Sequence, residues 1–169
     1  MKTFLKFSGL ISLVLAVVAF ILMLATNAVV VKSGNLQVVY SGGQAIFGWN
    51  EQNLLGQNVH YNGAPLALIS WILALAALLI ILLGLVLPLF KVKALERFAG
   101  ILNLVAVCCL VLAGIFVFPV VPNFYAANGW DVPEKAAIGG GWLIAGIIYI
   151  VAGAIAICPA VADFLGKKK

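Results

Sequence analysis

The chain has 169 residues, of which 65% are hydrophobic and 9% are charged, and its formal net charge is +5 at pH 7. A soluble domain has about 25% charged residues, so this composition cannot cover a globule with a surface that water tolerates. It excludes a soluble enzyme, and it excludes intrinsic disorder, which needs low hydrophobicity and high charge. The length fits a single membrane domain, residues 1–169, with room for four spans.

Four long stretches without charged residues predict four transmembrane helices, because a helix needs about 20 apolar residues to cross the hydrocarbon layer. Their lengths and composition place the spans near residues 7–28, 66–89, 98–118 and 139–161. The segments are apolar on every side, which favours helices over the alternating strands of a barrel. We therefore expect an all-α transmembrane fold, an antiparallel four-helix bundle. Asp131 and Glu134 fit a capping box that starts the last span.

The basic residues predict the orientation of these spans. Lys32 and Lys135 lie at one end, and all the other basic residues lie at the opposite end: Lys2, Lys6, Lys91, Lys93, Arg97, Lys167, Lys168 and Lys169. By the positive-inside rule we expect a multi-pass protein of the cell membrane with both termini in the cytoplasm. Trp71 and Trp142, at the outer helix ends, are expected to anchor the membrane interface.

The N-terminus has a second interpretation, which stays open. Lys2, Lys6, the apolar run and Thr26-Asn27-Ala28 also fit a secretory signal with a cleavage site. The apolar run exceeds the usual signal length of about 7–15 residues, which favours a retained helix. The intact mass distinguishes the two, because cleavage would leave a mature chain that begins near Val29.

The first external connection, residues 29–65, predicts a small extracellular antiparallel β-sheet. Leu36–Tyr40 and Ala45–Trp49 are rich in β-branched and aromatic residues, and Gly42-Gly43 between them suits a tight turn, so we expect a hairpin. Gln57–Tyr61 predicts a third strand. A disordered loop is the alternative, which the aromatic content disfavours.

Ionisable residues are missing from the cores of the predicted spans, where they would mark proton relays or ion paths. The one histidine, His60, is external and cannot complete a metal site alone. Cys108, Cys109 and Cys158 lie within spans and form no Cys-x-x-Cys pair of the kind that thiol oxidoreductases use. We therefore expect no catalytic residue, no cofactor, no metal and no nucleic-acid partner.

Small residues predict close packing between helices, because they let backbones approach where lipid removes the hydrophobic drive. Asn103, in the third span, can hydrogen-bond a neighbouring helix. The first and fourth spans carry seams of small side chains at Gly9, Ser12, Ala16, Ala19, Gly141, Ala145, Ala152, Ala156 and Ala160. Packing within the chain is favoured over a dimer face.

Aromatic residues of a type favoured at binding patches gather in the external segments and predict a contact surface. They are Tyr40, Phe47, Trp49, Tyr61, Phe124, Tyr125 and Trp130. The alternative is that these rings pack the sheet against the helix ends. We expect a non-enzymatic integral membrane protein that acts through interaction or assembly, with the lipid bilayer and another membrane protein or a second copy as partners. A small oligomeric channel or transporter component is the alternative function.

The order of elements resembles the claudin-type arrangement of four helices with a long first external segment and a short second one. Phe47-Gly48-Trp49 is similar to the aromatic-glycine motif of that family's first external segment, although the family's external cysteine pair has no counterpart here. Ile46–Gly48 ahead of the second span is also similar to small uncharacterised bacterial four-helix membrane proteins. The claudin-like layout implies lateral assembly and cell-surface contacts, and it supplies no catalytic residue.

Overall fold

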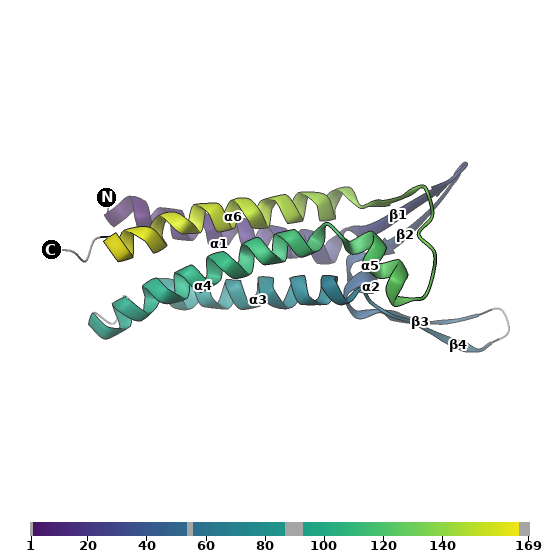
Figure 1. Cartoon of the computed structure of the whole chain (residues 1–169), viewed down its shortest axis with the longest axis horizontal. Helices are drawn as coiled ribbons and strands as arrows, with labels where there is room; N and C mark the ends of the chain where they lie inside the picture. The colour runs from purple at the N-terminus through teal and green to yellow at the C-terminus, as the bar shows by residue number, and fades with distance from the viewer. Residues whose placement is uncertain (1, 54–55, 87–92, 166–169) are drawn as a thin grey trace.

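The computed structural model describes residues 2–53, 56–86 and 93–165, and most of these residues are helical. Four long helices lie side by side along the length of the molecule (Figure 1). They are α1 (Lys2–Ala25), α3 (Pro65–Val86), α4 (Lys93–Val117) and α6 (Gly140–Leu165). In the described part of the chain, each contains a segment long and apolar enough to cross a membrane: Phe7–Ala25, Pro65–Val86, Gly100–Val117 and Gly140–Cys158. The prediction of four apolar candidate spans is confirmed.

The first span ends earlier than the prediction. The first was expected to reach residue 28, but α1 ends at Ala25 and a strand begins at Asn27. Residues 87–89 of the second fall outside the described residues. The capping box expected at Asp131 and Glu134 is wrong, because a strand follows them and α6 begins only at Gly140.

Small side chains occupy the interior between the long helices. Helix α4 contacts α3 and α6, and α1 contacts α6 and α3. The fully buried positions are largely alanines, such as Ala16, Ala19, Ala74, Ala77, Ala106, Ala113, Ala145 and Ala152. Leucine, isoleucine and valine instead face outward, as at Leu79, Leu82 and Ile147. This distribution is the reverse of a water-soluble core.

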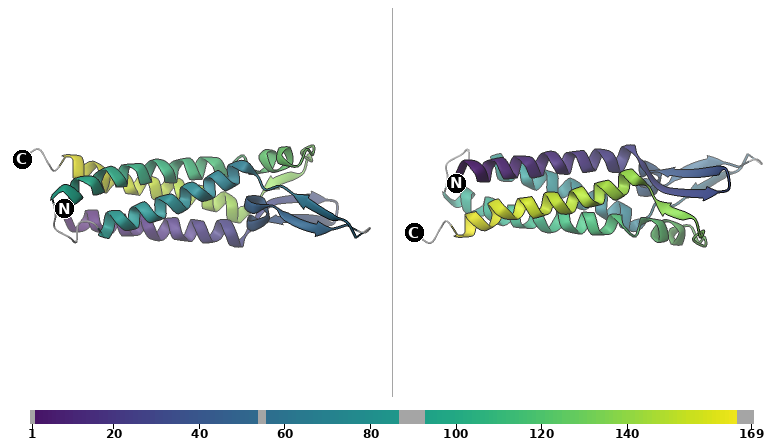
Figure 2. Two further views of the ribbon diagram at one scale, coloured as in Figure 1. Left: turned by 90° about the horizontal axis from the view of Figure 1, so that it is seen from below. Right: turned by 90° about the horizontal axis from the view of Figure 1, so that it is seen from above.

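All strands of the described chain lie at the end of the molecule opposite to where α1 begins and α6 ends (Figures 1 and 2). One antiparallel sheet has the order β2 (Leu36–Ser41), β1 (Asn27–Ser33), β5 (Ala136–Ile138). A second pairs β3 (Trp49–Gln52) with β4 (Asn58–Tyr61). Two short helices, α2 (Gly42–Phe47) and α5 (Val120–Ala127), lie beside them. We call these seven elements the strand end.

The hairpin forms with a different partner from the one predicted. Leu36–Ser41 is a strand, but it pairs with Asn27–Ser33 through a turn at Gly34, whose φ of 60° suits glycine. The strand predicted at Ala45–Trp49 is wrong, because most of it is helix. Ser41 caps α2 by accepting from the Gln44 backbone N–H while the Gln44 side chain accepts from the Ser41 N–H, a capping box. The third predicted strand is present as β4 and pairs with β3.

Carbonyls at the end of α1 accept hydrogen bonds both from α6 and from the strand end. A helix leaves its last carbonyls without helical partners. Here the Trp142 Nε1–H donates to the Met23 carbonyl at 2.7 Å, and the Gly42 N–H donates to the Thr26 carbonyl at 2.8 Å. Trp142 is fully buried, so its expected role as an interface anchor is wrong.

Gly139 joins β5 to α6 at a point where no side chain fits. Its N–H donates to the Ala28 carbonyl at 2.9 Å, and a Cβ atom there would collide with the Asn27 carbonyl. We expect Gly139→Ala to lower the free energy of unfolding by about 1–3 kcal/mol, because the obstructing atom is backbone and cannot move aside. Gly140→Ala is the matched control, since its Cβ would meet open space, and should stay within about 0.5 kcal/mol of the parent. Denaturant titration in micelles measures both, and equal effects would contradict this account.

Candidate functional site

A cluster of aromatic rings forms the centre of the strand end. Phe124, on α5, is fully buried in the middle of it. Its ring centroid lies 4.8 Å from that of Tyr40, 6.0 Å from Trp49, 5.8 Å from Tyr125 and 6.2 Å from Trp130. These rings come from β2, β3, α5 and the segment after α5, so the cluster ties the two sheets to one short helix.

Trp49 packs against other rings of the cluster. Tyr61 stacks on it with centroids 4.5 Å apart at 22°, and Phe124 lies nearly parallel to it at 7°. Trp130 in turn meets Tyr61 edge-on at 5.6 Å. These rings therefore pack against one another in the stacked and edge-on arrangements that aromatic pairs prefer.

Six of the seven aromatic residues expected to form a contact surface meet in this cluster, which we call the aromatic cluster: Tyr40, Trp49, Tyr61, Phe124, Tyr125 and Trp130. Phe124 and Tyr125 are buried, so they support the strand end from inside and offer no surface to a partner. They belong to helix α5 and not to a loop. Phe47 lies apart, 56% exposed, with its ring edge-on to Trp71 at 5.2 Å.

A cleft of about 310 Å³ opens beside the aromatic cluster, between β2 and the β3–β4 pair. Its charged group is Glu51, whose Oε2 accepts from the Trp49 Nε1–H at 3.4 Å. Burial raises the pKa of the Tyr40 phenol, and the nearby Tyr61 and Glu51 raise it further. The cleft therefore disfavours added negative charge. Its lining residues are Val38, Val39, Tyr40, Gln44, Glu51, Trp49, Tyr61 and Trp130.

Strand β2 is an edge of its sheet, since among the described residues it pairs only with β1. Its side chains are largely exposed: Leu36 by 75%, Val38 by 51% and Val39 by 42%. Natural edge strands are usually protected by charge, proline or a covering segment. The sequence Leu36–Tyr40 contains neither a charged residue nor a proline. Beside the cleft, β2 thus presents an apolar strand edge of the kind that another strand can extend.

The residues predicted to pack the helices lie between them. Ser12 donates from Oγ to the Ala152 carbonyl at 2.8 Å, and Asn103 lies against Gly84 of α3. Gly9 lies beside Leu85, and Gly141 lies against Thr26. The remaining members are buried: Ala16, Ala19, Ala145, Ala152, Ala156 and Ala160.

Several residues that shape the strand end did not stand out in the sequence. The Asn62 N–H donates to Asn128 Oδ1 at 2.8 Å, and Asn128 Nδ2 donates back to the Asn62 carbonyl at 2.9 Å. Only the Ser41 to Gln44 capping box had a recognisable spacing.

The described residues contain no group of three or more His, Cys, Asp or Glu side chains that could hold a metal ion. A scan against protein-family models and a search of curated proteins found no match for this chain.

The central position of Phe124 generates a prediction about stability. Phe124→Ala should lower the free energy of unfolding by about 3–5 kcal/mol, because it empties the middle of the aromatic cluster. Phe47→Ala removes the same ring from an exposed site with one ring contact, and should cost only about 1 kcal/mol. Thermal unfolding followed by tryptophan fluorescence compares the two variants. A smaller loss for Phe124→Ala than for Phe47→Ala would show that the cluster is not the core of the strand end.

Proposed function

We propose that this chain is a non-enzymatic multi-pass protein of the cell membrane that acts through interaction or assembly. Its four long helices form an antiparallel bundle in lipid, and its strand end lies outside the membrane as the contact surface. Both termini are cytoplasmic by the distribution of basic residues. No cofactor, metal or nucleic acid takes part.

The side-chain distribution along the helices supports the position in lipid. Most leucine, isoleucine and valine side chains face outward along all four, while alanines and serines fill much of the interior beside a few larger side chains such as Leu110, Trp142 and Tyr149. Because lipid tails are as apolar as leucine, outward-facing leucines gain nothing from burial in protein, and small interior residues let the backbones pack closely. Water would penalise the same exposed surface heavily.

The observation that carries the proposal is the exposed apolar edge of β2. The backbone groups along an edge strand can pair with an extended segment of another chain, and alternate side chains then give specificity. Leu36, Val38 and Val39 supply apolar contacts for such a segment. The aromatic cluster holds the inner end of β2 through Tyr40, so the edge is presented on a rigid support.

A claudin-like layout is consistent with this mode of action, because it implies lateral assembly through segments outside the membrane. The strands of the β1–β2 hairpin run along the long axis of the molecule (Figure 1). A chain in the same membrane can therefore bring a strand beside β2 without tilting its helices. The partner is another membrane protein or a second copy of this chain.

The contacts between the four long helices do not favour the alternative function, a small oligomeric channel or transporter component. The Ser12 and Ser70 hydroxyls, which could otherwise line a polar path, both donate to backbone carbonyls of neighbouring helices. Ser70 Oγ also lies 4.0 Å from the Met23 sulfur. The interaction role is the better match to these contacts.

Chemical crosslinking in native membranes tests the contact role of β2. The wild-type chain should give a defined adduct with a partner or with itself, and Val38→Lys should reduce the adduct at least several-fold because a charged side chain protects a strand edge. Asn58→Lys places the same charge on the exposed face of β4 and is the matched control. No adduct from the wild-type chain, or an equal yield from Val38→Lys, would count against the proposal.

A further inference from the structure

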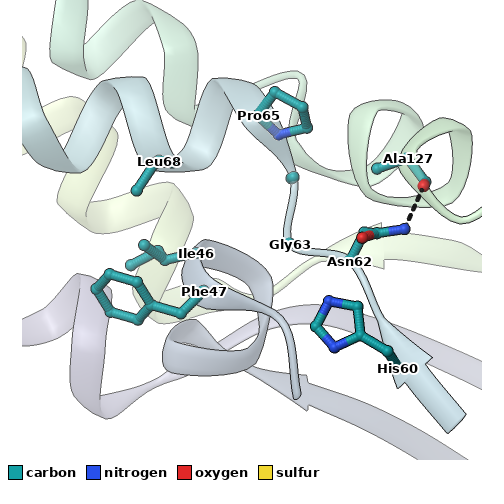
Figure 3. A pocket seen from close by; sticks show the side chains of 9 residues that line it. Ile46, Phe47, His60, Asn62, Gly63, Pro65, Leu68 and Ala127 are labelled. Carbon is teal, nitrogen blue, oxygen red and sulfur yellow. Dashed lines mark hydrogen bonds between the residues drawn. The ribbon is translucent and has the colours of Figure 1, made fainter. Parts of the chain in front are cut away.

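A second hollow, which we call the junction groove, lies where β4 leads into α3 (Figure 3). It has a volume of about 480 Å³ and is separate from the cleft beside β2. Its lining comes from α2, β4, the start of α3 and the end of α5: Ile46, Phe47, His60, Asn62, Gly63, Ala64, Pro65, Leu68 and Ala127. The groove thus lies at the level where the long helices give way to the strand end.

The polarity of the junction groove changes along the helix direction. Figure 3 shows Phe47 and Leu68 on the side of α3, and His60 and Asn62 on the side of β4. The apolar side is continuous with the outward face of α3, where Leu68 and, one turn further on, Ile72 are exposed. With the helices in lipid, this gradient follows the change from hydrocarbon to water. An amphiphile would lie in the groove with its chain along α3 and its head beside β4.

The polar side of the groove presents hydrogen-bond acceptors. Asn62 Nδ2 donates to the Ala127 carbonyl at 3.2 Å, and a carbonyl only accepts, so the Asn62 Oδ1 is left as an acceptor (Figure 3). His60 Nδ1 lies 2.7 Å from Asn50 Oδ1, which also only accepts, so Nδ1 carries the proton. In the tautomer with the proton on Nδ1, the ring offers Nε2 as a second acceptor. Asn128 holds Asn62 in place through bonds to both of its backbone groups.

We propose that the junction groove binds a membrane lipid whose head donates hydrogen bonds, namely a phospholipid with a primary ammonium group such as ethanolamine. The ammonium donates to Asn62 Oδ1 and His60 Nε2, and one acyl chain lies along Phe47 and Leu68. A trimethylated head of the choline type has the same charge but no N–H to donate, so it binds less well. This inference rests on the proposed position of the helices in lipid and not on the contact role of β2.

Lipid titration of the purified full-length chain, followed by native mass spectrometry, tests the proposal. The probes are dioleoyl phosphatidylethanolamine and dioleoyl phosphatidylcholine, which share their chains and differ in the N-methyl groups. The wild-type chain should bind the ethanolamine lipid roughly three- to tenfold more tightly, the effect of one or two net hydrogen bonds. Equal binding of the two lipids by the wild-type chain overturns the proposal whatever the variants do.

Two variants with matched controls locate the site. His60→Leu should bring the two lipids close to equal binding, while Asn58→Leu, two residues earlier on the same exposed face of β4, keeps the preference. Leu68→Trp should weaken binding of both lipids by filling the groove, while Ile72→Trp, on the same face of α3 but outside the groove, does not. An unchanged preference in His60→Leu, or equal effects of the two tryptophans, assigns the lipid to the general helix surface and overturns the proposal. If the wild-type chain gives no crosslinked adduct but still prefers the ethanolamine lipid, only the proposed contact role of β2 is contradicted.

Discussion

Close approach of helix backbones is the constraint on which the rest of this structure depends. In lipid, burying leucine between helices gains nothing, so the helices must be held by packing and by hydrogen bonds between them. Alanines meet in the interior, and a Cβ at Gly114 on α4 would collide with α6 at the Gly146 carbonyl. Ser12 and Ser70 each add a hydrogen bond to a carbonyl of a neighbouring helix. Most of the large apolar side chains face outward, with Leu110, Trp142 and Tyr149 as buried exceptions.

The same close packing sets where the strand end lies. The last turn of α1 lies close to the first turn of α6, so the Trp142 side chain on α6 can donate to the Met23 carbonyl on α1. For the same reason β5, just before α6, can pair with β1, just after α1. The aromatic cluster then joins the two sheets to α5 through Phe124. Stacking within the cluster leaves the outer edge of β2 and the junction groove as open features. In the proposals above, the first meets a partner chain and the second holds a lipid.

The candidate spans could be predicted from the sequence because charge-free windows of this length have few other structures available. The strand that pairs with β2 could not be predicted from the sequence. Ala28–Val31 is apolar and is separated from the first helix only by Thr26 and Asn27, and it is a strand in which Val29–Val31 pair with both β2 and β5. The start of α2 carried a local signal in Ser41 and Gln44, which the neighbouring β-branched and aromatic residues obscured. Local propensity is weaker than tertiary contacts at such positions.

The aromatic residues show a similar division. Their gathering outside the spans was visible in the sequence, but which of them are buried depends on α5 being a helix that turns Phe124 and Tyr125 inward. The junction groove was not visible, since it joins residues from four elements and its polar side is defined by the bond from Asn62 to Ala127. Such features follow from the arrangement of elements and leave no spacing pattern.

The most direct test of the central claim is the side of the membrane on which each end of the molecule lies. In a chain whose Cys108, Cys109 and Cys158 are replaced by alanine, single cysteines are placed at Asn35, in the β1–β2 turn, and at Lys2, near the start of α1. A membrane-impermeant maleimide applied to intact cells should label the cysteine at position 35 and should label the one at position 2 only after the cells are opened. Labelling of both from the same side would contradict four lipid-spanning helices with a strand end outside.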